Sequence, residues 1–256
     1  MKQYKLIILF LFTILFVSCS SDDGKISFTI LQLNDVYEIS SIQGGKYGGM
    51  ARVETVHQEL VAKNKNTLLV MAGDFLNPSL LGTMKHEGVR VRGKQMIEVM
   101  NAMSFDLVAF GNHEFDIPKK DLQKRMDESN FPWISSNVFN KTADSIKQFY
   151  QELNGVKRLI KGSFIKEIFD EDGTKIKVGF ISVCIPSNPK DYVLYKDMFS
   201  AIVKEYESIK NKVDIVIGLT HVKIEHDREI AKLLPNIPLI MGGHEHTNKN
   251  EMIGNV

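Results

Sequence analysis

Short apolar, β-branched segments alternate along this sequence with longer segments of helical spacing, and this alternation restricts the fold more than any other feature. The apolar segments are typical of buried strands, and the segments between them repeat apolar residues at three- and four-residue intervals. Strand, helix and strand in alternation predict an α/β architecture. We expect strands at residues 26–33, 67–73, 106–111, 177–184, 214–221 and 237–244, and helices at 50–64, 93–103, 120–129, 197–212 and 228–234.

One part of the chain predicts an antiparallel pair within this pattern. Residues 158–183 contain two alternating runs on either side of Asp172 and Gly173. An Asp-Gly pair between two such runs indicates a hairpin. We therefore expect a mixed sheet rather than a purely parallel one.

The N-terminus has the pattern of an export signal. A basic start is followed by an apolar run from Leu6 to Val17 and by a serine directly before Cys19. The run is shorter than the roughly 20 residues of a spanning helix. We predict that residues 1–18 are a lipoprotein signal peptide and residues 19–25 a lipidated polar tether, so the protein is exported and anchored to a membrane through Cys19, on a periplasmic or cell-surface face. The alternatives are an ordinary cleaved signal and an unmodified cysteine.

Residues 26–256 are long enough for one sizeable α/β domain. The formal net charge is only +1, and no strongly basic stretch lies outside the signal, so nucleic acid is not expected as a partner.

Cys184 is the cysteine that remains once Cys19 is assigned to the anchor. It lies in an apolar run, where we expect a packed thiol and no intramolecular disulfide.

Polar residues follow the apolar segments at the points where the strands are expected to end. In α/β sheets that edge forms the crevice in which ligands bind. Four of the seven histidines occupy such positions, and glycines precede several of the polar residues, as sharp turns beside a ligand require. Carboxylates, an amide and imidazoles delivered together suit a divalent transition metal such as Mn, Zn or Fe. The residues are Asp35, Asp74, Asn112, His113, His221, His244 and His246.

The ordered motifs NDVY, GDF, GNHEFD, GLTH and GGHEH resemble those of the calcineurin-like metallophosphoesterase superfamily. The segments YGGMARVETV and NFPWISSNV are similar to the branch that contains 5′-nucleotidases and UDP-sugar hydrolases. The resemblance runs from residue 27 to the end. It implies a β-sandwich flanked by helices (αββα), which would be C-terminally incomplete here.

The resemblance also implies roles for individual residues. Two divalent metal ions would be bridged by Asp74, and His113 would face the substrate with Asp116 orienting it. The neighbouring Glu114 and Glu245 are expected to point away from the metals, because successive side chains at a strand end face different sides. The remaining ligands would be Asp35 and His246 on the first metal, and Asn112, His221 and His244 on the second.

The implied reaction is the hydrolysis of phosphate esters, above all 5′-nucleotides. Two metals would polarise the phosphoryl group and activate a bridging hydroxide, while His113 assists departure of the alkoxide. Cyclic phosphodiesters, UDP-sugars and sulfur compounds, the substrates of related branches, stay open. The substrate is therefore expected to be a small molecule.

Two departures from the family pattern lead to an alternative. The first motif has Tyr37 where the family has a histidine, which leaves the first metal short of an imidazole unless water or Tyr37 fills the position. Only ten residues follow His246, so the family's C-terminal nucleotidase domain is expected to be absent or separately encoded as a partner. The alternative is a catalytically impaired or inactive surface lipoprotein fragment that retains partial metal binding.

Overall fold

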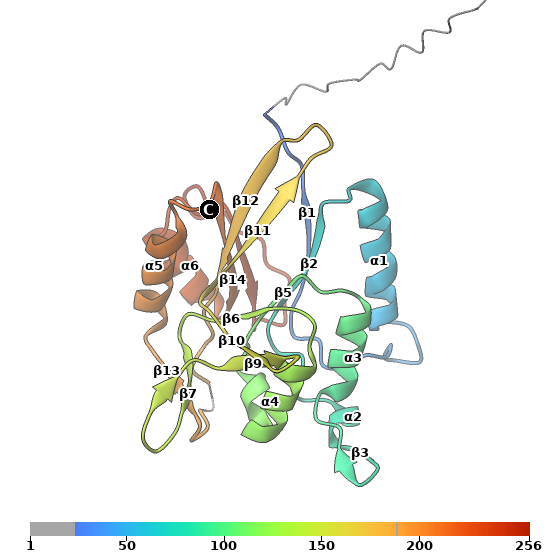
Figure 1. The fold of residues 1–256 in the computed structure, drawn as a ribbon. Helices are drawn as coiled ribbons and strands as arrows, with labels where there is room; N and C mark the ends of the chain where they lie inside the picture. Colours follow the sequence, from blue (N-terminus) through green and yellow to red (C-terminus); the bar gives the residue numbers. More distant parts are fainter. Residues whose placement is uncertain (1–23, 188) are drawn as a thin grey trace, which may run out of the picture.

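Two four-stranded sheets pack face to face at the centre of the protein, as the computed structural model shows for residues 24–187 and 189–256 (Figure 1). The predicted signal peptide and the lipidation site Cys19 lie outside the described residues. The first sheet is parallel throughout. Its spatial order is β1 (Thr29–Leu33), β2 (Thr67–Ala72), β5 (Leu107–Ala109) and β6 (Trp133–Ile134).

The second sheet is mixed, as the sequence predicts. Its first two strands form an antiparallel hairpin around the turn that contains Asp172 and Gly173, and the other pairs are parallel. Its order is β11 (Ser163–Phe169), β12 (Lys175–Ile181), β14 (Ile215–His221) and β15 (Ile240–Gly243).

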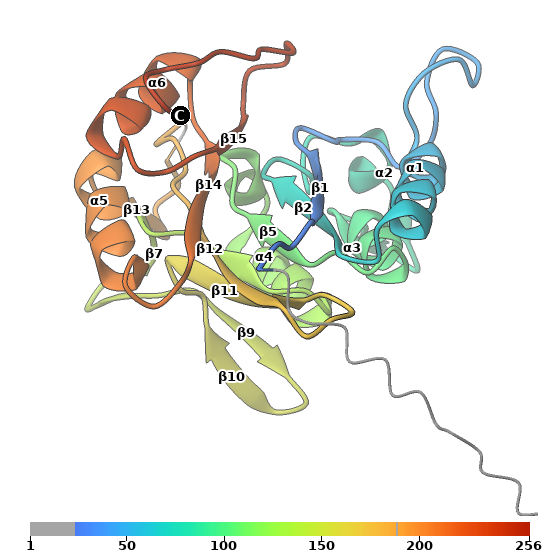
Figure 2. The ribbon, with the colours of Figure 1, turned by 90° about the horizontal axis from the view of Figure 1, so that it is seen from above.

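Side-chain alternation along the strands builds three hydrophobic layers. On β2, Leu68 and Val70 face the second sheet, whereas Leu69 and Met71 face the helices. Both faces of this strand are buried, which explains its uninterrupted apolar sequence. Helices cover the two outer faces, so the αββα arrangement is confirmed (Figures 1 and 2). They are α1 (Met50–Lys63), α3 (Lys94–Ala102) and α4 (Lys119–Glu128) on the first sheet, and α5 (Met198–Ile209) and α6 (Ile224–Leu233) on the second.

Smaller elements decorate this sandwich. The predicted helices are all present, but α6 begins one turn before the expected residue 228, at Ile224, whose N–H is accepted by the Glu245 side chain. β6 and the short strands outside the two sheets were not predicted from the sequence, because runs of two to four residues carry little periodicity. These further elements are α2 (Leu80–Thr83), β3 (Lys85–His86), β4 (Val89–Arg90), η1 (His113–Asp116), β7 (Val138–Lys141), β8 (Ile146–Lys147), β9 (Tyr150–Leu153), β10 (Val156–Leu159) and β13 (Val193–Tyr195).

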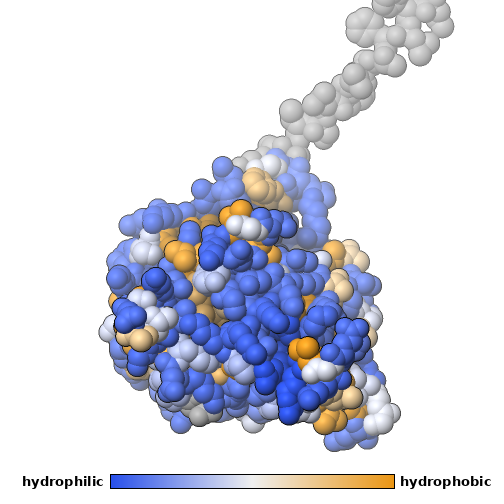
Figure 3. Space-filling model, turned by 60° about the horizontal axis from the view of Figure 1, so that its bottom comes forward, coloured by the Kyte–Doolittle hydropathy of each residue, from blue (hydrophilic) through white to orange (hydrophobic). Residues whose placement is uncertain are grey.

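The parallel strands of both sheets run downward in Figure 1, and the loops that follow them lie below the sheets. Figure 3 looks toward this end of the molecule, whose surface is mostly hydrophilic with small separate hydrophobic patches. No helix within residues 24–187 and 189–256 is both long and apolar enough to cross a membrane.

Candidate metal centre

Asp74 lies in a loop whose backbone N–H groups are bound by the buried carboxylate of Glu114. Glu114 is fully buried, and its two oxygens accept hydrogen bonds from the N–H groups of Asp74, Phe75, Leu76 and Gly111 at 2.6–3.2 Å. This one side chain therefore joins the loop after β2 to the loop after β5. Burial beside Asp74 raises the pKa of Glu114 to about 7, although the four N–H groups favour its ionised form.

Glycines allow the loops to approach one another at two points. Gly73 has φ 81°, and a Cβ added there would lie 2.7 Å from Nδ1 of His221. A Cβ on Gly243 would lie 2.8 Å from the same nitrogen. Larger residues at either position would push His221 out of place, so these two glycines are required by close packing.

Three buried polar atoms at the strand ends have no hydrogen-bond partner. They are Asp74 Oδ2, Asn112 Oδ1 and His221 Nε2, and their residues are at most 4% exposed. Nε2 of His221 lies 3.0 Å from Asp74 Oδ2, in a geometry that is not a hydrogen bond. Burying polar atoms unpaired is costly, so the neighbouring atoms of Asp74 and His221 fit a cation bound by both, and Asn112 offers a further unpaired oxygen after β5.

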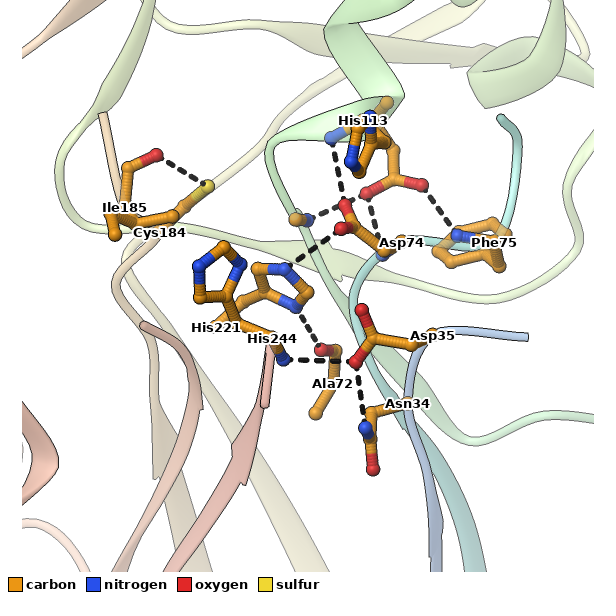
Figure 4. Close-up of polar contacts among 12 residues, drawn as sticks. Asn34, Asp35, Ala72, Asp74, Phe75, His113, Cys184, Ile185, His221 and His244 are labelled. Atoms are coloured by element: carbon orange, nitrogen blue, oxygen red, sulfur yellow. Dashed lines mark hydrogen bonds and ion pairs between the residues drawn. The ribbon is translucent and has the colours of Figure 1, made fainter. Parts of the chain in front are cut away.

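The orientation of His221 fits the same interpretation. Its Nδ1 lies 2.7 Å from the carbonyl oxygen of Ala72 and donates to it, which leaves the Nε2 lone pair directed at Asp74 (Figure 4). Burial opposes protonation, but the carboxylates of Asp74 and Asp35 outweigh burial and raise the pKa of His221 to about 9. A metal ion would take the place of this proton.

His244 completes this group. Its ring stands edge-on to that of His221, with centroids 5.3 Å apart. Among the residues described, Asp74, His221 and His244 form a group of ligands whose donor atoms all lie within 4.8 Å of one another. Burial and the neighbouring His221 lower the pKa of His244, which keeps its imidazole neutral and able to bind a metal.

The residues expected on the first metal are arranged differently. Tyr37 Oη donates to Asp35 Oδ1 at 3.1 Å, His246 Nε2 lies 3.1 Å from the same oxygen, and Oη and Nε2 are 3.2 Å apart. The other Asp35 oxygen accepts from the Asn34 side chain and the His244 N–H. Burial and the nearby Asp74 and Asp35 carboxylates raise the pKa of the Tyr37 phenol, so Tyr37 is a protonated hydroxyl rather than a phenolate ligand.

His113 and Asp116 lie beside the buried donor set. The His113 N–H donates to Asp74 Oδ1 at 2.7 Å, and its ring Nδ1 lies 2.6 Å from Asp116 Oδ2. The His113 side chain is 38% exposed, so it can reach a bound molecule. Burial works against ionisation of Asp116, but His113 and Lys190 outweigh it and lower its pKa. Lys190 Nζ lies 3.3 Å from Asp116 Oδ1.

The backbone is strained where these residues are presented. Asp35, Asp74 and His244 have φ values of 53°, 59° and 80°, in the left-handed region that non-glycine residues avoid. Each such residue costs about 1–3 kcal/mol. The buried hydrogen bonds around them maintain these conformations.

The two carboxylates that were expected to point away from the metals bind backbone N–H groups in the structure. Glu114 binds backbone N–H groups, as described above, and Glu245 accepts from the N–H of Ile224 at 3.2 Å. Cys184 is a buried free thiol, as predicted from its apolar run.

Two residues of the site were not predicted from the sequence. Asn34 orients Asp35 by donating to its carboxylate, and Lys190 pairs with Asp116. Asn34 directly precedes Asp35 in the NDVY motif, and this position was the available signal. Lys190 lies in no motif, so no comparable signal pointed to it.

The comparisons with known proteins agree with this architecture. Residues 28–248 match the family model for calcineurin-like phosphoesterases. The chain is 30% identical over 244 residues to the snake venom 5′-nucleotidase of Crotalus adamanteus, which covers 88% of this chain and 38% of that protein. It is also 30% identical over 240 residues to the 5′-nucleotidase of Homo sapiens, with 88% and 39% covered. A solved 5′-nucleotidase precursor from Thermus thermophilus has a TM-score of 0.68 at 24% identity, covering 88% of this chain and 43% of that one.

A helix-flanked double sheet with carboxylate, amide and imidazole groups at its strand ends defines a metallophosphoesterase-type domain. The chain belongs to the calcineurin-like phosphoesterase family. It spans less than two-fifths of the length of the two nucleotidases, 38% and 39%. Their similarity therefore extends to the domain described here and not to the whole of either protein.

Proposed function

We propose that this protein hydrolyses phosphate esters in a metal-dependent reaction, and that 5′-nucleotides are its preferred substrates. The observation that carries the proposal is the group formed by Asp74, His221 and His244, with unpaired buried atoms on the first two, beside the His113–Asp116 pair. A cation site next to a hydrogen-bonded histidine offers what phosphoryl transfer needs, namely charge stabilisation and a proton donor.

The residues that would hold a metal ion are Asp74, Asn112, His221 and His244. Their mixture of carboxylate, amide and imidazole groups suits Mn, Zn or Fe. When bound, divalent ions of this kind polarise phosphoryl oxygens and make water nucleophilic at neutral pH. The resemblance implies two such ions, and the unpaired atoms favour the position of the second, buried ion.

His113 would supply the proton to the leaving alkoxide. Its Nδ1 is engaged by Asp116, so Nε2 is the nitrogen that can face the substrate. The carboxylate raises the basicity of the ring and fixes its orientation, while Lys190 holds Asp116 from the other side. The Asp74 carboxylate fixes the His113 backbone by accepting its N–H. A direct hydrogen bond therefore joins the backbone of the proton donor His113 to the metal-binding residue Asp74.

A nucleotide is favoured because both curated relatives described above are named 5′-nucleotidases. Neither this likeness nor the geometry specifies the base, so the substrate class is proposed at the level of the phosphate ester. A separately encoded C-terminal nucleotidase domain is the further partner we propose. We also retain the proposal that Cys19 is lipidated and anchors the exported protein to a membrane.

Chelation and reloading test this function. The full chain is stripped with a chelator and then supplied with Mn²⁺ or Zn²⁺. We expect phosphate release from an aryl phosphate and from adenosine 5′-monophosphate to vanish on stripping and to return on reloading. Phosphate release that survives complete metal removal would reject the proposal.

Tyr37 favours the second candidate function, a surface lipoprotein that binds metal without turnover. Its phenol takes the place of a ligand that the family supplies as histidine. Metal content that is restored on reloading with no phosphate release from either substrate would select this candidate.

A further inference from the structure

The two expected metal positions differ in whether their polar atoms already have partners. This inference rests on the proposed metal-dependent function and concerns the group formed by Tyr37, Asp35 and His246, which we name the Tyr37 triad. Its three contacting atoms, Oη, Oδ1 and Nε2, are 3.1–3.2 Å apart in every pair. The triad is therefore closed by hydrogen bonds of its own.

The Asp35 carboxylate has a donor directed at each of its available positions. Oδ1 faces the Tyr37 hydroxyl and the His246 ring, and Oδ2 accepts from Asn34 at 2.7 Å and from the His244 N–H at 2.9 Å. A carboxylate offers about four acceptor positions. A metal ion would have to displace one of these hydrogen-bond donors, whereas Oδ2 of Asp74 makes no hydrogen bond and has only the Nε2 atom of His221 beside it, at 3.0 Å.

The triad is also short of ligands and open to water. The His246 side chain is 63% exposed. Within the described ranges, Asp35 and His246 do not join any third carboxylate, histidine or cysteine in a group whose donor atoms all lie within 4.8 Å. A protonated phenol is a poor ligand for a divalent ion, because its pKa is normally near 10. A buried carboxylate with one exposed imidazole and a hydroxyl makes a weak site.

We propose that this protein holds one resident metal ion, at Asp74, Asn112, His221 and His244, and that the Tyr37 triad occupies the first position in place of a second ion. The triad stands next to the proton donor, since the Tyr37 ring lies 6.2 Å from that of His113 and 5.8 Å from that of His246. Tyr37 thus lies beside His113 and His246, at the position where the family has a metal ligand.

Metal content measured on the purified full chain tests the proposal without relying on activity. After saturation with Mn²⁺ and removal of loosely bound ion, elemental analysis should give about one equivalent, since one complete donor set is present. Electron paramagnetic resonance should show the spectrum of an isolated Mn²⁺ ion. Two equivalents with a spin-coupled spectrum would overturn the inference and leave the proposed function intact, whereas no bound metal would overturn the proposed function itself.

Two matched histidine variants locate the ion. His244→Ala should reduce the content from about one equivalent to near zero. His246→Ala, only two residues away and more exposed, should leave it unchanged. A loss of metal in His246→Ala comparable to that in His244→Ala would contradict the inference.

A gain-of-binding variant tests Tyr37 directly. Tyr37→His exchanges the hydroxyl donor for an imidazole lone pair, so we expect the content to rise to about two equivalents and the coupled spectrum to appear. Adding His246→Ala to this variant should return the content to one. Circular dichroism checks that each variant is folded, and a folded Tyr37→His protein that stays at one equivalent would show that Tyr37 does not determine occupancy.

Discussion

The buried donor set and the Tyr37 triad differ in solvation although they are neighbours. In the donor set, Asp74 and His221 are at most 1% exposed and carry atoms without partners. In the triad, every facing atom has a hydrogen bond, and His246 is open to solvent. Unsatisfied buried groups cost free energy and satisfied exposed ones do not, so the first arrangement calls for a cation and the second does not.

Strand order explains part of the difference. Asp74 and His221 follow β2 and β14, which are interior strands of their sheets. Asp35 and His246 follow β1 and β15, which lie at the edges. Strand order therefore matches the burial of Asp74 and His221 and the exposure of His246. It does not separate the two halves completely, because His244 also follows β15 and the Asp35 side chain is only 5% exposed.

Replacing one carboxylate in each half gives the largest expected contrast. Asp74→Asn should remove the bound metal and lower phosphate release on the order of 10³-fold, because the amide cannot supply the buried negative charge. Asp35→Asn should leave metal content unchanged and reduce the rate far less. Metal analysis and steady-state kinetics measure both. Equal losses in the two variants would mean that the halves act as one site.

Replacing the proton donor His113 should affect turnover without affecting metal content. His113→Ala should keep its metal while turnover falls by about 10²–10⁴-fold, the range for loss of a general acid. Asp116→Asn should have the same effect in milder form, since it disturbs only the orientation and charge of the ring. If His113→Ala loses metal as thoroughly as His244→Ala, then His113 is a ligand and another group must act as the acid.

Replacing the two carboxylates that bind backbone N–H groups, Glu114 and Glu245, should lower the stability of the protein by different amounts. Glu114→Gln turns an amide N–H₂ toward backbone N–H groups and leaves buried donors unpaired, so unfolding free energy should fall by about 2 kcal/mol or more. Glu245→Gln, at the partly exposed start of α6, should cost less than about 1 kcal/mol. Urea unfolding of the metal-free proteins measures both. A Glu114 variant as stable as the wild type would show that the hydrogen bonds of Glu114 to the two loops are dispensable.

The last contrast is the pH dependence of metal binding. In the metal-free protein the pKa of His221 is raised from 6.5 to about 9, so the proton's stabilisation is complete below pH 6.5 and is lost as the pH rises through 9. A metal ion displaces this proton, so its binding should strengthen by about tenfold per pH unit across that window. Thermal melts with and without Mn²⁺ should therefore diverge from pH 6.5 to 9. A constant difference in Tm would argue against His221 as a ligand.

The sequence predicted the layers and the convergence of the polar residues because both depend on local patterns. Apolar strands buried on two faces are visible as uninterrupted runs, and residues after parallel strands meet at one edge. The Tyr37 triad could not be predicted in this way. Asp35 and Tyr37 are two residues apart, and they meet only because the left-handed turn at Asp35 redirects the chain.

The role of Glu114 was outside the reach of sequence reasoning for a related reason. Its position between Asn112 and Asp116 predicted only that it points away from the metals. Its partners include the N–H groups of Asp74 and Leu76, which precede it by 40 and 38 positions. Such contacts follow from how two loops pack, and no periodicity within either loop encodes them.

Tyr37 also has a consequence at the level of the gene. Tyrosine and histidine codons differ only in their first base, T or C, so one transition in codon 37 would exchange the hydroxyl of the triad for an imidazole. Random single-base mutagenesis therefore samples both forms of the site without any intermediate. A selection for phosphate release under scarce or abundant metal would enrich one form over the other, and the direction of enrichment would reveal which metal supply each form suits.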